Sequence, residues 1–250
     1  MGIGYSTWRF CVSLVSLCAL AIVNTGCKAG PAKSAGFVDA SLMGHDKTLP
    51  FQKYWQKPGL DKAKYTKIYI APVNTAYMLK MTDWQKGDRK EQFTADVAMI
   101  AKYTETAMKK AYTDDPKHRY TVVDSPTKDP DTLIFEMALI EIVPSKVVLN
   151  ALGYTPFFIG MGITAVRGIA QDESTVAFEA RILDASTGET VIMLADREAE
   201  QKAIATVRGL TWYSHAQFII SQWASQFVQM ANQKPGEVIK ETDPFTLQPF

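Results

Sequence analysis

Four carboxylates and two arginines lie close together in the last third of the chain. The carboxylates are Asp184, Glu189, Asp196 and Glu198, and the arginines are Arg181 and Arg197. Two neighbouring carboxylates can share the work of general acid and base. Oppositely charged side chains on paired strands, however, commonly form ion pairs on an exposed face. We therefore expect cross-strand ion pairs here and assign no catalytic residue, with a hydrolase as the alternative.

The remaining residue types that could carry chemistry are scattered. His45, His118 and His215 have no cysteine, histidine or carboxylate at metal-ligand spacing. The sequence contains no nucleophile elbow, phosphate-binding loop or zinc-protease motif. "GMGITA" from Gly160 fits a dinucleotide fingerprint, but we expect a strand after it where that fingerprint requires a helix. The sequence predicts no cofactor and no metal.

The N-terminus has the pattern of an export signal. Arg9 precedes an apolar run over 10–23, and small or polar residues lead to Cys27. The run is shorter than the roughly 20 residues of a membrane span. "TGC" at 25–27 resembles the lipobox of bacterial lipoproteins, although Asn24 departs from the aliphatic residue expected there. An ordinary signal cleaved near Gly26, or an uncleaved anchor, is the alternative.

The lipobox resemblance implies that residues 1–26 are removed and that a fatty acyl chain such as palmitate is attached to Cys27. Cys11 and Cys18 would leave with the signal peptide, so the mature chain would contain no other thiol. Lys28 stands where an aspartate would imply retention in the inner membrane. By resemblance, the expected location is the outer membrane, with the domain facing the periplasm.

The charge balance excludes one class of partner. The chain carries 27 basic and 26 acidic residues, and removal of 1–26 takes away only Arg9, which leaves 26 of each. Nucleic-acid-binding domains are strongly basic, so we expect no nucleic-acid partner.

Hydrophobic periodicity predicts one α+β domain: a mixed sheet of four to five strands with two long helices packed on one face. The strand over 131–143 is apolar on both sides, which indicates a central position. The hairpin alternates between a buried face and a face that we expect to be mostly wet. The expected strands cover 67–73, 119–124, 131–143 and a hairpin over 174–198, and the expected helices cover 87–112 and 211–233. The expected division of the chain is signal peptide 1–26, tether and edge segment 27–64, α+β domain 65–233 and polar tail 234–250.

Two apolar stretches fall outside this pattern. Residues 147–166 are uncharged, but Asn150, Pro156 and three glycines interrupt any continuous helix. The segment could be core, a span, or a surface that contacts a partner or the membrane. Its candidate contact residues are Phe157, Phe158, Ile159 and Met161. The aromatic cluster of Phe51, Tyr54 and Trp55 is expected to pack on the domain edge, with sugar stacking as the alternative.

Residues 36–232 resemble a family of predicted bacterial lipoproteins with no assigned function. The shared features are a first strand ending in Pro-Val, an Asp-x-x-Thr-Gly-Glu hairpin and a following Asp-Arg. These residues are Tyr65, Lys67, Pro72, Val73, Asp184, Thr187, Gly188, Glu189, Asp196 and Arg197. A non-enzymatic envelope lipoprotein is expected from the lipobox-like cysteine, the predicted α+β domain and the lack of a catalytic constellation. Its domain would bind or assemble with an envelope protein, for example as an accessory to a transport complex. A periplasmic small-ligand-binding protein is the alternative.

Overall fold

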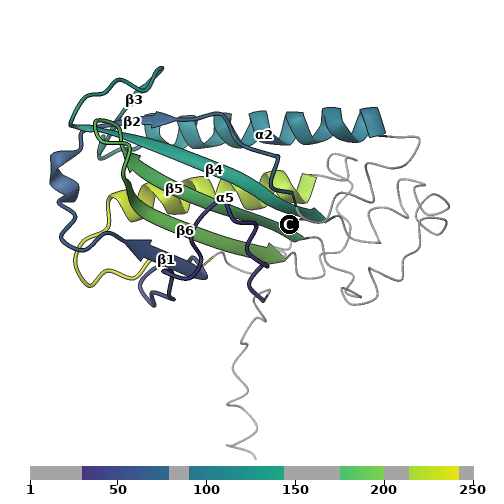
Figure 1. Cartoon of the computed structure of the whole chain (residues 1–250), viewed down its shortest axis with the longest axis horizontal. Coiled ribbons are helices and arrows are strands. Elements are labelled where there is room, and N and C mark those ends of the chain that lie inside the picture. Colours follow the sequence, from purple (N-terminus) through teal and green to yellow (C-terminus); the bar gives the residue numbers. More distant parts are fainter. Residues whose placement is uncertain (1–29, 79–89, 144–174, 200–213, 242–250) are drawn as a thin grey trace, which may run out of the picture.

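A computed structural model describes residues 30–78, 90–143, 175–199 and 214–241. A six-stranded mixed sheet has the order β1-β6-β5-β4-β2-β3, in which β2 runs parallel to β3 and β4 and the other pairs are antiparallel. Two long helices lie on one side of it (Figure 1). The elements are β1 (Lys53–Gln56), η2 (Lys62–Lys64), β2 (Lys67–Ile70), α2 (Lys90–Thr113), β3 (Thr121–Val123), β4 (Thr132–Val143), β5 (Thr175–Asp184), β6 (Thr190–Ala199) and α5 (Ser214–Ala231).

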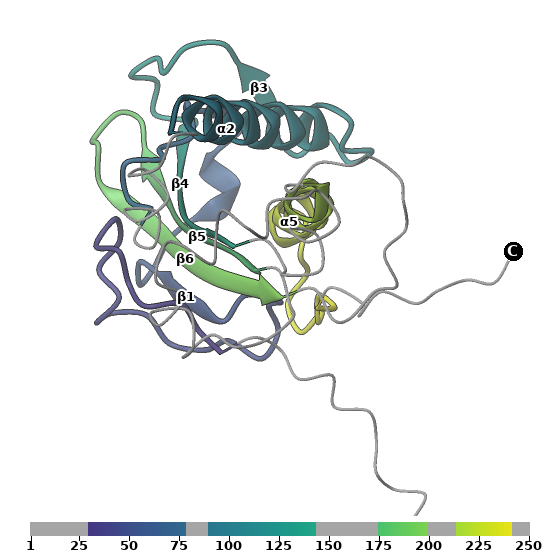
Figure 2. The same cartoon turned by 90° about the vertical axis from the view of Figure 1, so that its right-hand side faces the viewer.

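The main core lies between the sheet and the two helices. Figure 2 shows α2 and α5 on the same side of the curved sheet. Trp223 and Phe227 of α5 are fully buried against Phe178 of β5, and the Phe178 and Trp223 rings meet edge to face at 4.6 Å. Val97 and Ile100 of α2 complete this layer. The predicted α+β fold, with both helices on one face, is confirmed.

Strand β4 is central, as its sequence predicts. Phe135, Met137 and Leu139 face the helices, whereas Ala138 and Ile140 contribute to a second apolar cluster on the opposite face. The register of β4 against β5 shifts between Leu139 and Glu141, so that Ile140 is an extra residue.

The sheet has one strand more than predicted. Strand β1 pairs antiparallel with β6, with Tyr54 opposite Leu194, and forms one edge of the sheet. It lies within the segment that we expected to be a tether and edge. Phe51, just before β1, is fully buried in the main core, with its ring centroid 4.9 Å from that of Phe227. Tyr54 packs against the same core and Trp55 against the second apolar cluster, so the three aromatics pack on the domain but do not form one edge cluster.

The outer face of the hairpin is covered, not mostly wet as predicted. Residues 30–44 cross this face, and the second apolar cluster includes Phe37, Val38, Ala177 and Met193. Glu179 at the centre of the face is only 1% exposed. The alternation of apolar and polar residues distinguishes the two faces of a hairpin. It does not show whether a segment distant in sequence covers the polar face.

Within the described ranges, no helix has the length and apolar character needed to cross a membrane.

Candidate functional site

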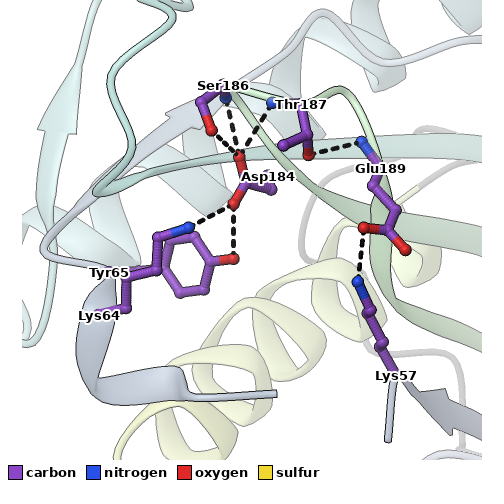
Figure 3. Close-up of polar contacts among 7 residues, drawn as sticks. All are labelled: Lys57, Lys64, Tyr65, Asp184, Ser186, Thr187 and Glu189. Carbon is purple, nitrogen blue, oxygen red and sulfur yellow. Dashed lines mark hydrogen bonds and ion pairs between the residues drawn. The ribbon is translucent and has the colours of Figure 1, made fainter. Parts of the chain in front are cut away.

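The most conspicuous polar cluster surrounds the hairpin turn between β5 and β6 (Figure 3). Asp184 ends β5, and one of its carboxylate oxygens accepts hydrogen bonds from Ser186 N (2.9 Å), Ser186 Oγ (2.5 Å) and Thr187 N (3.1 Å). Gly188 supplies the positive φ of 73° that the turn requires. The backbone N of Glu189 donates to Thr187 Oγ1 at 3.2 Å, whereas the Glu189 carboxylate turns to Lys57 Nζ at 2.6 Å.

The second oxygen of Asp184 joins the turn to the segment just before β2. It accepts from Lys64 Nζ at 2.7 Å and from the Tyr65 hydroxyl at 2.9 Å. Burial alone would raise the pKa of Asp184, but the hydrogen bonds from Lys64, Ser186 and Tyr65 outweigh it and hold that pKa well below its usual range. Burial, followed by the bond to Asp184, raises the pKa of Tyr65 to about 12. The cluster therefore holds one ionised carboxylate and one neutral phenol as a structural joint.

The arginines of the hairpin bind carboxylates of β4, not those of the hairpin itself. Arg181 Nε lies 2.7 Å from Glu136 Oε2. Arg197 reaches across β5 to Glu141, with Nε at 3.0 Å and Nη2 at 2.9 Å from the same oxygen. Thr175 Oγ1 donates to this oxygen at 2.6 Å. The predicted pairing of these arginines with hairpin carboxylates is wrong, because the cross-strand neighbours on this face come from the central strand.

Glu179 lies between these two ion pairs and binds the N-terminal segment. Oε1 accepts from Ser34 Oγ at 2.8 Å and Ala35 N at 2.9 Å, and Oε2 accepts from Phe37 N at 2.8 Å and Val38 N at 3.2 Å. We call these contacts the Glu179 clamp. The sheet neighbours of Glu179 are Ala138 and Ala195, and their small side chains leave room for the backbone to approach.

The carboxylate of Asp196 links the sheet to α5 and to the segment before β1. Asp196 accepts from Trp223 Nε1 at 3.0 Å and from Gln52 N at 3.1 Å. Three of the carboxylates that could have formed an acid–base pair, Asp184, Glu189 and Asp196, thus bind different groups at different places. Their arrangement indicates no catalytic function.

A groove lies between the C-terminal halves of α2 and α5, with a volume of about 710 Å³. The helices run parallel here, because Tyr103 contacts Ser221 (2.7 Å between the hydroxyl oxygens) and Asp115 accepts from Asn232 Nδ2 at 2.9 Å. The apolar side chains of the lining include those of Ala107, Ala111 and Val228. The sequence does not reveal this groove, because the small residues that open it occupy ordinary helical positions.

Comparison with known proteins places the chain in a family. Residues 33–227 match the family described as "Protein of unknown function (DUF3313)".

The chain belongs to this family.

Several solved structures resemble this DUF3313 chain at low sequence identity. The PelC dodecamer from Paraburkholderia phytofirmans is 12% identical, with 69% of this chain and 95% of that chain covered and a TM-score of 0.37. Lipoprotein GNA1162 from Neisseria meningitidis is 12% identical, with 67% and 99% covered and a TM-score of 0.28. The hypothetical protein CT253 from Chlamydia trachomatis is 7% identical, with 67% and 91% covered and a TM-score of 0.31. No curated protein sequence matches the chain.

The predicted resemblance to a family of unassigned function is confirmed, and the motif residues of this DUF3313 chain now have structural roles. Tyr65, Asp184 and Thr187 fix the turn, and Asp196 fixes α5 to the sheet. The family match begins at residue 33 and does not include Cys27. The lipid attachment of this DUF3313 chain therefore stays a prediction.

The other predicted site residues are not brought together. Cys27, Phe157, Phe158, Ile159 and Met161 lie outside the described residues. His45, His118 and His215 fall before β1, after α2 and at the start of α5, respectively. In the described parts of the chain, no group of histidine, cysteine or carboxylate side chains could hold a metal ion. The sequence analysis missed Glu179 and Glu141, for which the only signal was a carboxylate in an otherwise apolar strand.

Proposed function

We propose that this DUF3313 protein is a non-enzymatic lipoprotein of the bacterial envelope. A lipid on Cys27 anchors it in the outer membrane, and its domain faces the periplasm as a binding or assembly module, accessory to an envelope transport complex. The observation that carries the proposal is the Thr-Gly-Cys sequence at 25–27 directly after an apolar export signal. The structural use of the hairpin carboxylates supports the non-enzymatic part.

The anchor is tested by labelling cells with an alkyne fatty acid. Wild-type protein should incorporate the label and fractionate with membranes, whereas Cys27→Ser should lose both properties. Cys18→Ser is the matched control, because Cys18 would be removed with the signal. Unchanged labelling of Cys27→Ser would contradict the proposal.

The location in the outer membrane depends on the residue after the acylated cysteine. Wild-type protein, with Lys28, should sediment with outer membranes in a density gradient, and Lys28→Asp should move it to the inner-membrane fractions. Sedimentation of the wild type with inner membranes would contradict this part.

We further propose that Phe157, Phe158, Ile159 and Met161 contact a partner protein or the membrane. Val143 and Thr175 are paired neighbours at one end of the sheet, so the connection that contains these residues leaves and returns at this end. The double variant Phe157→Ser/Phe158→Ser should keep the unfolding midpoint and lose partners recovered by crosslinking in cells. Loss of the fold would instead assign the segment to the core.

The groove favours a second candidate function, the binding of a small amphipathic molecule. Its lining combines Ala107, Ala111 and Val228 with the polar side chains of Ser225 and Gln229. Anilinonaphthalene sulfonate should bind the wild type, and Ala107→Trp should fill the groove and abolish the fluorescence. Lys128→Trp, on an exposed loop, is the control. Equal fluorescence of the two variants would exclude this function.

A further inference from the structure

We infer that one end of the sheet, formed by Glu141, Thr175 and Arg197, is held against the lipid bilayer by a short and fixed connection. The inference rests on the proposed acylation of Cys27 and adds to it an orientation of the domain. It concerns the residues between the anchor and the sheet, which the sequence pattern predicts to be a tether.

The Glu179 clamp binds residues 34–38 to the sheet, so only the few residues between Cys27 and the clamp can act as a tether. A buried carboxylate is stable only when hydrogen-bond donors replace its water, and four donors from residues 34–38 do this for Glu179. Phe37 and Val38, beside these donors, are buried in the outer apolar cluster. Release of the segment would therefore expose apolar side chains and strip a buried charge of its donors at the same time.

A second contact fixes the chain closer to the anchor. Arg197 Nη1 donates to the carbonyl oxygen of Gly30 at 3.3 Å, and the rest of the guanidinium binds Glu141. The side chains of Arg197 and Glu141 are only 14% and 5% exposed, so this arginine is itself held in place. Residue 30 therefore lies at the end of the sheet where β4 and β6 finish and β5 begins.

The length of the remaining connection sets the distance to the membrane. An extended chain spans at most about 3.5 Å per residue, so Cys27 lies within about 25 Å of Ser34 and within about 10 Å of Gly30. The opposite end of the sheet is much farther away, because a strand of the length of β4 extends for about 40 Å. The sheet end at Arg197 therefore faces the bilayer, and the hairpin turn at Asp184 points into the periplasm.

The absence of further cysteines after Cys27 makes this orientation measurable. A single cysteine introduced at Ala199, paired with Thr175 at the near end, or at Lys128, in the exposed loop before β4, can be labelled selectively. The acylated full-length protein would be reconstituted into phosphatidylcholine vesicles that carry a nitroxide on the headgroup. The near-end fluorophore at Ala199→Cys should be quenched, and the fluorophore at Lys128→Cys should not.

Two changes test the clamp. A flexible Gly-Ser insertion between Ala29 and Gly30 lengthens the connection without touching the domain, and Glu179→Gln removes acceptor capacity from the clamp. Each should abolish quenching at Ala199→Cys, whereas Glu189→Gln, which alters only an exposed ion pair, should not. If Glu179→Gln fails to fold, the insertion alone decides.

Equal quenching at the two positions, no quenching at Ala199→Cys, or unchanged quenching after the insertion would overturn the orientation. A protein that does not remain with the vesicles at all would instead overturn the acylation of Cys27 and the orientation with it. The two failures are therefore distinguishable in one experiment.

Discussion

Buried carboxylates act as joints in this protein. Asp184, Glu179 and Asp196 each accept hydrogen bonds from segments that are distant in sequence. A buried carboxylate destabilises the fold unless hydrogen-bond donors are placed around it, and those bonds have a defined geometry. Each of these carboxylates therefore holds the segment that supplies its donors in a fixed position against the sheet. None of the three is placed to exchange a proton with a substrate, because every one is occupied by structural donors. The grouping of Asp184 and Asp196 among the acid–base candidates of the sequence therefore reflects their structural hydrogen bonds.

The joint at Asp184 predicts a measurable loss of stability. Asp184→Asn removes the charge that binds Lys64 and cannot accept every bond of the carboxylate, so the free energy of unfolding should fall by about 1–3 kcal/mol. Urea unfolding followed by tryptophan fluorescence measures the change. Glu189→Gln, which alters an exposed pair with Lys57, should cost at most about 1 kcal/mol. Equal losses in the two variants would contradict this role.

Low pH should lower the free energy of unfolding of the wild type through protonation of Asp184. The folded-state pKa of this carboxyl lies below its unfolded value of about 3.9, so its contribution is present above that pH. The contribution is lost as the pH falls through the folded-state pKa. Between pH 5 and 2, the stability of the wild type should therefore fall more steeply than that of Asp184→Asn. Parallel pH profiles, measured by urea unfolding at each pH, would contradict the assignment.

High pH should lower the free energy of unfolding through ionisation of Tyr65, which donates to Asp184. Its folded-state pKa of about 12 lies above the unfolded value of about 10, so the neutral phenol stabilises the fold below pH 10. This contribution should disappear as the pH rises from about 10 to 12. Tyr65→Phe, compared with wild type by urea unfolding across that range, should lose less stability with rising pH. Identical slopes would show that other groups control the alkaline transition.

Most helices and strands could be predicted from the sequence, but the N-terminal segment that covers the outer face of the sheet could not. Helices α2 and α5 and strands β4 to β6 follow the sequence periodicity, because each buries one face or both against its neighbours. Strand β1 has only four residues, all half-buried, and carries no alternation to detect. The Glu179 clamp joins residues that are 141 to 145 positions apart. The local sequence pattern does not show which residues so far apart will contact each other, so the sequence analysis missed the Glu179 clamp.

The ion pair that bridges β4 and β6 predicts strong coupling between elements. Arg197→Met removes the guanidinium that binds the buried carboxylate of Glu141, which should cost about 3–5 kcal/mol. The double variant Glu141→Met/Arg197→Met should recover much of that loss, because both buried charges are removed together. A double-mutant cycle by chemical denaturation measures the coupling. Additive losses would contradict a mutually dependent pair.

On the scale of the whole molecule, the sheet is covered on both faces by different means. Two helices cover one face, and the N-terminal segment with residues 37 and 38 covers part of the other. The outer cover has few apolar side chains, so its attachment depends on the polar contacts at Glu179 as well as on burial.

Removal of the outer cover should destabilise the entire domain. A signal-free chain that begins at Asp39 lacks Phe37 and Val38 and every donor of the Glu179 clamp, whereas a chain that begins at Lys33 retains them. Loss of the two apolar side chains alone predicts a decrease of roughly 3–6 kcal/mol in the free energy of unfolding. Urea midpoints of the two purified chains test this, and equal midpoints would contradict it.

The long sequence separation within the Glu179 clamp orders the events of biogenesis. In a chain that is translocated from its N-terminus, Ser34 emerges 145 residues before Glu179. Under the proposed acylation of Cys27, the processing enzymes would therefore act on an unfolded segment, because Glu179, which binds residues 34–38, has not yet been translocated. In that proposal lipid attachment precedes folding, and the domain takes its orientation only after the hairpin of β5 and β6 has arrived.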